Sequence, residues 1–149
     1  MVKGSISIYS DLVAQYFMCI KKPLVEKAFK SKLIPTYSFS RVYFKDNVMK
    51  RHSDRPSCEV SVSLNIWSDT QWPLWFETEK GDVPMYTKPG EAVFYEGQKY
   101  NHWRDPFEGE SCFQIFMHYI RAEGENRDRA YDGMENIKFP KLIMKPWLR

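Results

Sequence analysis

The chain has 149 residues, 43 % hydrophobic and 16 % aromatic, a composition typical of one folded domain and not of a disordered chain. Its formal net charge of +3 is small for a dedicated nucleic-acid-binding domain. The three cysteines (19, 58 and 112) show no paired spacing, which argues against a disulfide framework and favours a reducing compartment such as the cytoplasm.

No apolar run approaches the roughly 18 residues of a membrane span, and the N-terminal residues MVKGSISIYSD lack the apolar core of a signal peptide. No repeat or Gly/Ser linker divides the chain. We therefore expect a single domain over residues 1–149, cytoplasmic and without a membrane partner.

The first predicted elements are helical. Ser10 can serve as the N-cap of a helix that Pro23 interrupts, and a second helical stretch ends before Pro35. This helical lead-in covers about residues 10–33. Its first part spaces these apolar residues as one helical face: Leu12, Val13, Tyr16, Phe17 and Ile20.

After Pro35 the pattern changes to the alternation of β-strands. Residues 36–44 alternate, residues 58–66 do so more regularly, and further strands are predicted over residues 73–79, 91–95 and 111–120. Short strands behind a helical lead-in predict a mainly β fold with N-terminal helices, a β-sandwich or jelly roll whose core spans about residues 36–121.

The chain has only three histidines, at positions 52, 102 and 118. His52 and Asp54 are two residues apart, so both side chains lie on one side of an extended segment. His102 follows the strand at 91–95, and antiparallel strands can bring it to the same end of a barrel. Two imidazoles and one carboxylate are the ligand set of the non-heme Fe(II) oxygenases.

Residues 35–119 resemble the 2-oxoglutarate/Fe(II)-dependent dioxygenases, specifically the prolyl-hydroxylase-like branch. Four segments carry the resemblance, in the family's order: YFKDNVMKRHSD, SVSLNI, KPGEAVFYEG and HWRDP. Tyr43 precedes His52 by nine residues, and Pro106 follows His102 by four, as in the family's motifs. The resemblance implies a double-stranded β-helix of jelly-roll, cupin-like type.

The resemblance also implies that His52, Asp54 and His102 bind Fe(II), and that Tyr43 donates its hydroxyl group to 2-oxoglutarate. In the family a cation on the strand after the second histidine pairs with the far carboxylate of 2-oxoglutarate. Residues 111–114 here are Ser-Cys-Phe-Gln, with no cation. Arg104 and Arg41 are the candidates to replace it, since a buried carboxylate needs a guanidinium or an equivalent donor set.

Structural explanations exist for the same residues. His52 and Asp54 could lie in a solvated loop, with Asp54 paired to Arg51 or Arg55, and His102 could be a hydrogen-bonded loop histidine. We interpret His118 as structural. Trp72, Trp75 and Trp103 could line a substrate groove, although core packing explains at least two of them. Residues 141–149 could pack across the sheet or mediate self-association.

The leading hypothesis is an iron- and 2-oxoglutarate-dependent hydroxylase acting on a peptidyl or small-molecule substrate. The alternative is a jelly-roll module that binds a ligand without redox chemistry, with or without a metal. A nucleic-acid partner would use Lys45, Lys50, Arg51 and Arg55, but no stacking aromatic residues alternate with these cations. The sequence leaves the substrate and the oligomeric state open.

Overall fold

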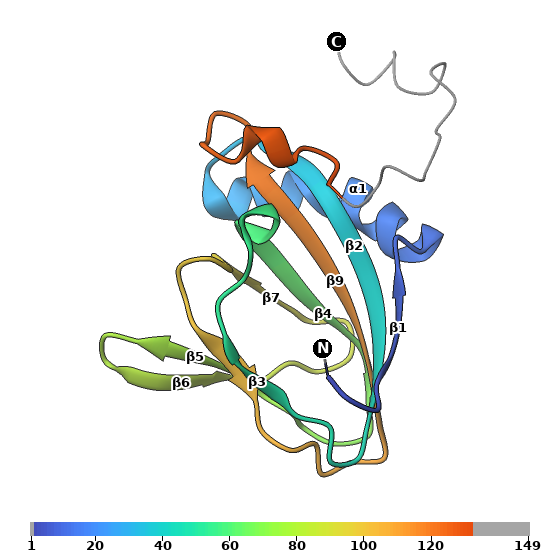
Figure 1. Cartoon of the computed structure of the whole chain (residues 1–149). Helices are drawn as coiled ribbons and strands as arrows, with labels where there is room; N and C mark the ends of the chain where they lie inside the picture. The colour runs from blue at the N-terminus through green and yellow to red at the C-terminus, as the bar shows by residue number, and fades with distance from the viewer. Residues whose placement is uncertain (1, 133–149) are drawn as a thin grey trace.

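The computed structural model describes residues 2–132, which form two antiparallel sheets and one α-helix (Figure 1). Five strands make up the larger sheet, in the order β1 (Ile6–Tyr9), β2 (Leu33–Phe44), β9 (Ser111–Arg121), β4 (Val60–Ser68) and β7 (Ala92–Tyr95). The smaller sheet contains β3 (Met49–His52), β8 (His102–Arg104), β5 (Leu74–Thr78) and β6 (Gly81–Met85). The predicted fold class, mainly β with two facing antiparallel sheets behind a helical start, is confirmed.

Two short 3-10 turns, η1 (Pro56–Cys58) and η2 (Arg127–Arg129), complete the described elements. Strands β1, β3, β6 and β8 were not predicted from the sequence. The end of the predicted domain 1–149 and the segment 141–149 lie outside the described residues.

The helical lead-in is one helix, α1 (Leu12–Phe29), so the prediction that Pro23 divides it was wrong. Asp11 is the N-cap, in place of Ser10, and its side chain accepts a hydrogen bond from the backbone N–H of Ala14 at 2.9 Å. The helix ends at Lys30, whose left-handed backbone (φ 49°) lets its N–H bond the carbonyl of Glu26. The described residues contain no helix of the length and apolar character that crossing a membrane requires.

The main apolar core lies between α1 and one face of the larger sheet. Ala14, Met18 and Val25 of α1 pack there, on both sides of Pro23 along the helix, which explains why the helix continues through the proline. The apolar face expected from the sequence is largely exposed, since Leu12, Val13, Tyr16 and Ile20 face solvent. The sheet contributes Leu33, Val60, Val62, Ile115, Met117 and Tyr119.

Replacing Pro23 by alanine is expected to raise the free energy of unfolding by about 1–3 kcal/mol, because proline inside a helix removes a backbone hydrogen bond and crowds the preceding turn. Pro23 is exposed, so no packing is lost. Urea denaturation would measure the change. Lys27→Ala, at another exposed helical position, should stay within about 0.5 kcal/mol of the unmodified protein. A lower stability of Pro23→Ala would contradict this account.

The opposite face of the larger sheet faces the smaller sheet and is unusually polar. The strand register sets Arg41 opposite Gln114, and Ser61 opposite His118. The rings of Tyr95 on the larger sheet and His102 on the smaller one lie 4.9 Å apart, which places this face inside the sandwich. Its buried polar side chains are Arg41, Ser61, Ser63, Asn65, Gln114 and His118.

Candidate metal centre

Strand pairing in the smaller sheet brings His52 and His102 together. His52 is the last residue of β3 and pairs with His102, the first residue of β8, so that their rings lie 4.5 Å apart. Asp54 follows in the loop after β3, where its backbone N–H donates to the carbonyl of Gly97 at 2.8 Å. This loop position places the Asp54 carboxylate next to the two imidazoles.

Both imidazoles direct the same nitrogen at one carboxylate oxygen. The Nε2 atoms of His52 and His102 each lie 3.7 Å from Oδ1 of Asp54. One candidate ligand atom from each of the three residues lies within 4.8 Å of the others. The structure therefore brings together the three side chains that the sequence analysis singled out, although they come from segments far apart in the chain.

Backbone carbonyls hold both rings in this orientation. Nδ1 of His52 lies 2.8 Å from the carbonyl oxygen of Lys50, and Nδ1 of His102 lies 3.0 Å from that of Tyr100. Because a carbonyl oxygen only accepts, Nδ1 of each ring carries a proton, and Nε2 is the nitrogen that faces Asp54. Burial lowers the pKa of His102, and the nearby Asp54 carboxylate partly offsets this effect.

The arginines that flank His52 in the sequence, Arg51 and Arg55, interact with groups other than Asp54. Arg51 bonds Glu77 and Asp82 and lies over the ring of Trp103, 3.9 Å from its centroid. Arg55 lies over the ring of Tyr37 and within 3.6 Å of Asp132. The explanation in which Asp54 merely pairs with Arg51 or Arg55 is therefore wrong.

Gly97 is the residue that leaves room for the Asp54 carboxylate. A Cβ atom at position 97 would lie 2.2 Å from Oδ2 of Asp54 and 2.5 Å from the carbonyl oxygen of Cys58. The backbone oxygen cannot move without a shift of the chain, so a larger residue there has to displace the carboxylate.

Gly97→Ala is accordingly expected to weaken binding of a divalent ion by about 10–100-fold, the range typical of disturbed support around a metal ligand. Titration with Co(II) would measure the loss. Gly124→Ala is the matched control, because its new Cβ would approach no described atom more closely than 3.1 Å. Equal affinity of Gly97→Ala and the unmodified protein would argue against a metal at Asp54.

Arg104 is buried between the sheets with almost no solvent contact. It lies two residues after His102, where its guanidinium donates to the carbonyl of Trp72 and to the Ser63 hydroxyl, and stacks over the Trp72 ring. Its Nε has no hydrogen-bond partner within residues 2–132. Burial lowers the pKa of Arg104, because the charged form is poorly solvated there.

Tyr43 and Arg41 face the same interior. The hydroxyl of Tyr43 and Nε of Arg41 are buried and form no well-aligned hydrogen bond among the described residues, although the Arg41 side chain lies within interacting distance of that hydroxyl. Burial raises the pKa of Tyr43, whereas Arg41 and Arg104 both lie close enough to lower it in part. Neither guanidinium forms an ion pair with a carboxylate in the described part of the chain.

The strand register places a cation beside the segment of β9 that has none. Arg41 lies directly opposite Gln114, and Tyr43 lies opposite Cys112, on the neighbouring strand β2. The charge missing from residues 111–114 is therefore present one strand away, on the same face of the sheet. The sandwich interior holds two positive side chains, Arg41 and Arg104, without a described anionic partner.

The tryptophans divide between two environments. Trp72 is buried and donates its indole N–H to the carbonyl of Asp105 at 2.7 Å. Trp75 and Trp103 stack with ring centroids 6.1 Å apart, and Arg51 covers Trp103. Trp103 directly follows His102 on β8, and consecutive strand residues point to opposite faces. Because His102 points inward, the stack of Trp75 and Trp103 lies on the outer face of the smaller sheet. Neither arrangement is a groove at the histidines.

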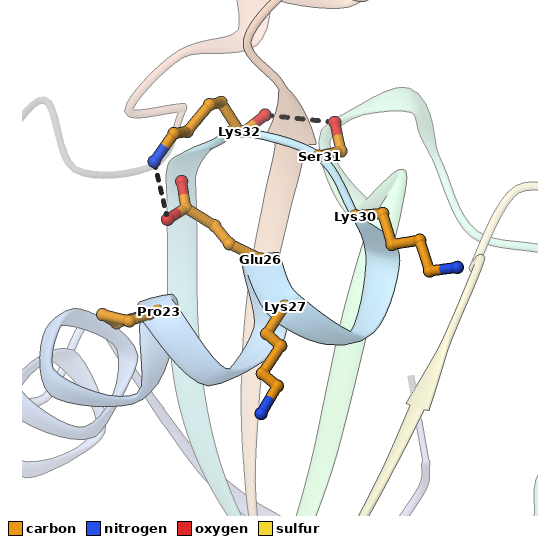
Figure 2. Close-up of a pocket in the computed structure, with 6 residues that line it drawn as sticks. All are labelled: Pro23, Glu26, Lys27, Lys30, Ser31 and Lys32. Atoms are coloured by element: carbon orange, nitrogen blue, oxygen red, sulfur yellow. Dashed lines mark hydrogen bonds and ion pairs between the residues drawn. The ribbon is translucent and has the colours of Figure 1, made fainter.

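A surface hollow of about 470 Å³ lies elsewhere, at the C-terminal end of α1 (Figure 2). Its lining includes Pro23, Lys27 and Lys30, and Lys32 lies 3.7 Å from the Glu26 carboxylate. None of the three clustered metal-ligand candidates borders it. The chemistry predicted from the sequence therefore does not involve this hollow.

Sequence analysis missed the supporting residues around Asp54. A second group of candidate ligand atoms, from Asp54, Cys58 and His118, also lies within 4.8 Å. Ser61 bonds both Asp54 and His118. The alternation of the sequence showed on which side of its own strand Ser61 and His118 each lie. It did not show the register that brings the two residues together.

No protein-family model and no curated protein sequence matches the chain. Solved structures do. A 2OG-Fe(II) oxygenase family oxidoreductase from Burkholderia pseudomallei superposes with a TM-score of 0.62 at 15 % identity, over 78 % of this chain and 57 % of that one. A prolyl-4-hydroxylase from Pseudomonas putida superposes with a TM-score of 0.59 at 16 % identity, over 80 % of this chain and 73 % of that one.

AviO1 from Streptomyces viridochromogenes gives a TM-score of 0.58 at 16 % identity, over 69 % of this chain and 57 % of that one. The chain has the fold of these three structures. The resemblance read from the sequence is thereby confirmed for the fold, the double-stranded β-helix. The chain spans 57 % of the length of the first and third of these structures.

Proposed function

We propose that the protein is an Fe(II)- and 2-oxoglutarate-dependent oxygenase, a hydroxylase, in which His52, Asp54 and His102 bind the iron. The observation that carries the proposal is the convergence of both Nε2 atoms on one oxygen of Asp54, at 3.7 Å each. Such an arrangement brings two imidazole nitrogens and a carboxylate oxygen to one point, as a shared divalent ion requires.

The donor set suits ferrous iron. Two neutral imidazoles and one carboxylate leave positions free for other ligands, as in non-heme Fe(II) oxygenases. The carbonyls of Lys50 and Tyr100 fix the ring orientation and the tautomer, as in most protein metal sites. When bound, the metal and 2-oxoglutarate would supply the oxidising power, and the protein's share is binding and orientation.

For 2-oxoglutarate, the proposal assigns Arg104, Arg41 and Tyr43. Each has a buried nitrogen or hydroxyl group that forms no well-aligned hydrogen bond in the described residues. Ionised donors are effective in such an interior because hydrogen bonds to a carboxylate are strong where water is excluded. In this proposal Arg104 binds the far carboxylate, with Tyr43 donating its hydroxyl and Arg41 adding charge from the neighbouring strand.

The substrate in this proposal is peptidyl or a small molecule. The fold is shared with a prolyl-4-hydroxylase, which favours a peptidyl substrate. Arg51 and Arg55, the arginines near the histidines, are already engaged with acidic or aromatic groups, which argues against a nucleic-acid partner. The three cysteines are free, in keeping with the reducing cytoplasm, where iron also stays ferrous.

The alternative function is a jelly-roll module that binds a ligand without redox chemistry. One observation favours it: β9 carries Cys112 and Gln114 where the family has a cation, so the 2-oxoglutarate anchor has to come from other strands. In that case the interior arginines would bind a different anion.

Anaerobic calorimetric titration with Fe(II), followed by 2-oxoglutarate, separates the two functions. The oxygenase should bind both, and on exposure to air it should release succinate from 2-oxoglutarate in an iron-dependent manner. Metal binding without affinity for 2-oxoglutarate would support the alternative. A protein that binds neither would end the proposal.

A further inference from the structure

Behind the candidate metal ligands, three polar side chains form a continuous chain of contacts. The hydroxyl oxygen of Ser61 lies 3.1 Å from Oδ2 of Asp54 and 2.9 Å from Nδ1 of His118. Ser61 and His118 are opposite one another on β4 and β9, and both are buried. The contact therefore links the larger sheet to the Asp54 carboxylate.

The number of available hydrogens shows which atom donates in the contact between Ser61 and His118. Ser61 has one hydroxyl hydrogen, and both Oδ2 of Asp54 and the carbonyl oxygen of Cys58, at 3.2 Å, can only accept it. If that hydrogen pointed at His118 instead, the Ser61 and Asp54 oxygens would face each other without a proton. The hydrogen between Ser61 and His118 therefore belongs to Nδ1 of His118.

The imidazole of His118 is held firmly enough to act as a fixed donor. The ring of Tyr37 lies 4.7 Å away and that of Phe39 lies 5.7 Å away. Burial lowers the pKa of His118 to about 4, so the ring is neutral at physiological pH. With the proton on Nδ1, Nε2 is a buried acceptor without a partner among the described residues. A buried acceptor without a partner is tolerated better than a buried N–H without one.

We propose that His118 is a positioning residue that acts through Ser61 on Asp54. Ser61 and the close backbone at Gly97 hold Oδ2, so the carboxylate presents Oδ1 to His52 and His102. The interpretation of His118 as a structural residue is thereby extended to a role in the site. The effect on metal binding rests on the proposed function, whereas the hydrogen-bond arrangement does not.

The first test needs no metal. Nitrogen NMR of the imidazoles in the metal-free protein should show His118 protonated on Nδ1. Ser61→Ala should shift the Nδ1 resonance of His118, because the ring loses its acceptor. A ring protonated on Nε2 would overturn the proposal, whatever the protein does with metals.

The second test measures Co(II) affinity in variants of matched shape. His118→Phe keeps an aromatic ring without a donor and should weaken binding by about 10–100-fold, as should Ser61→Ala. His118→Asn offers an amide N–H near the position of Nδ1 and should recover most of the affinity. The double variant Ser61→Ala/His118→Phe should be no weaker than either single variant, because both changes break one linkage.

Ser38→Ala, a buried serine on β2, is the control and should bind Co(II) like the unmodified protein. The free energy of unfolding is recorded for every variant. Additive losses in the double variant, or equal losses in His118→Asn and His118→Phe, would overturn the positioning role. If the unmodified protein binds no metal while the NMR shows the Nδ1 tautomer, the proposed function fails and the hydrogen-bond arrangement stands.

Discussion

Replacing His52 by alanine is expected to weaken Fe(II) binding by at least about 1000-fold, since even outer partners of metal ligands contribute 10–100-fold. The fold should be little affected. The His52 side chain is 43 % exposed and lies at the end of β3, which pairs with only one neighbour in the smaller sheet. Anaerobic calorimetry with Fe(II) measures the affinity, and urea denaturation checks the fold.

Lys50→Ala is the control for this experiment. Lys50 lies on the same strand, and only its backbone carbonyl contacts the His52 ring, so the alanine variant keeps the contact. It should bind Fe(II) like the unmodified protein. Equal binding by the His52→Ala protein would rule out the metal role of His52 and, with it, the proposed oxygenase.

Arg104→Met should lower 2-oxoglutarate affinity by about 30- to 1000-fold, corresponding to the 2–4 kcal/mol typical of a lost partner in a buried charge pair. The unliganded protein should nevertheless be about as stable as before, or more stable. A buried guanidinium without a carboxylate partner carries a desolvation cost that its contacts with Trp72 and Ser63 offset only in part, and an apolar side chain of similar volume removes it. Calorimetry and urea denaturation measure the two quantities.

Arg51→Met serves as the control, because that guanidinium lies over Trp103 and pairs with Glu77 and Asp82. It should not change 2-oxoglutarate binding. Arg41→Met tests the other candidate anchor, and a larger loss there than in Arg104→Met would move the far carboxylate to Arg41. A sharp loss of unliganded stability in Arg104→Met would mean that the arginine is a structural residue.

The grouping of His52, Asp54 and His102 was predictable because the spacing of the first two and the strand before the third are local patterns. The ligand role of these residues stays a prediction. That Arg41 lies directly opposite Gln114 could not be predicted, because it depends on the register of β2 against β9. Register is set by turns and by packing across the whole sheet, and a single strand does not contain it.

The errors in the sequence analysis have similar causes. Pro23 was taken as a helix boundary on local grounds, but the packing of Ala14, Met18 and Val25 against the sheet keeps one helix across it. The strands β1 and β6 are only four and five residues long and largely exposed, so each offers a sequence pattern too short to predict an edge strand. Tertiary contacts decided these elements.

The location of the main apolar core has a consequence for how this protein can change. Since α1 and the outer face of the larger sheet form the largest single apolar cluster, polar residues lining the interior, such as Gln114 and Asn65, are not part of it. Substitutions at these two positions leave that cluster intact, although each breaks a buried hydrogen bond, from Ser63 to Gln114 or from Asn65 to the carbonyl of Thr87. A change of the lining is therefore constrained by the local hydrogen bonds more than by the packing between α1 and the larger sheet.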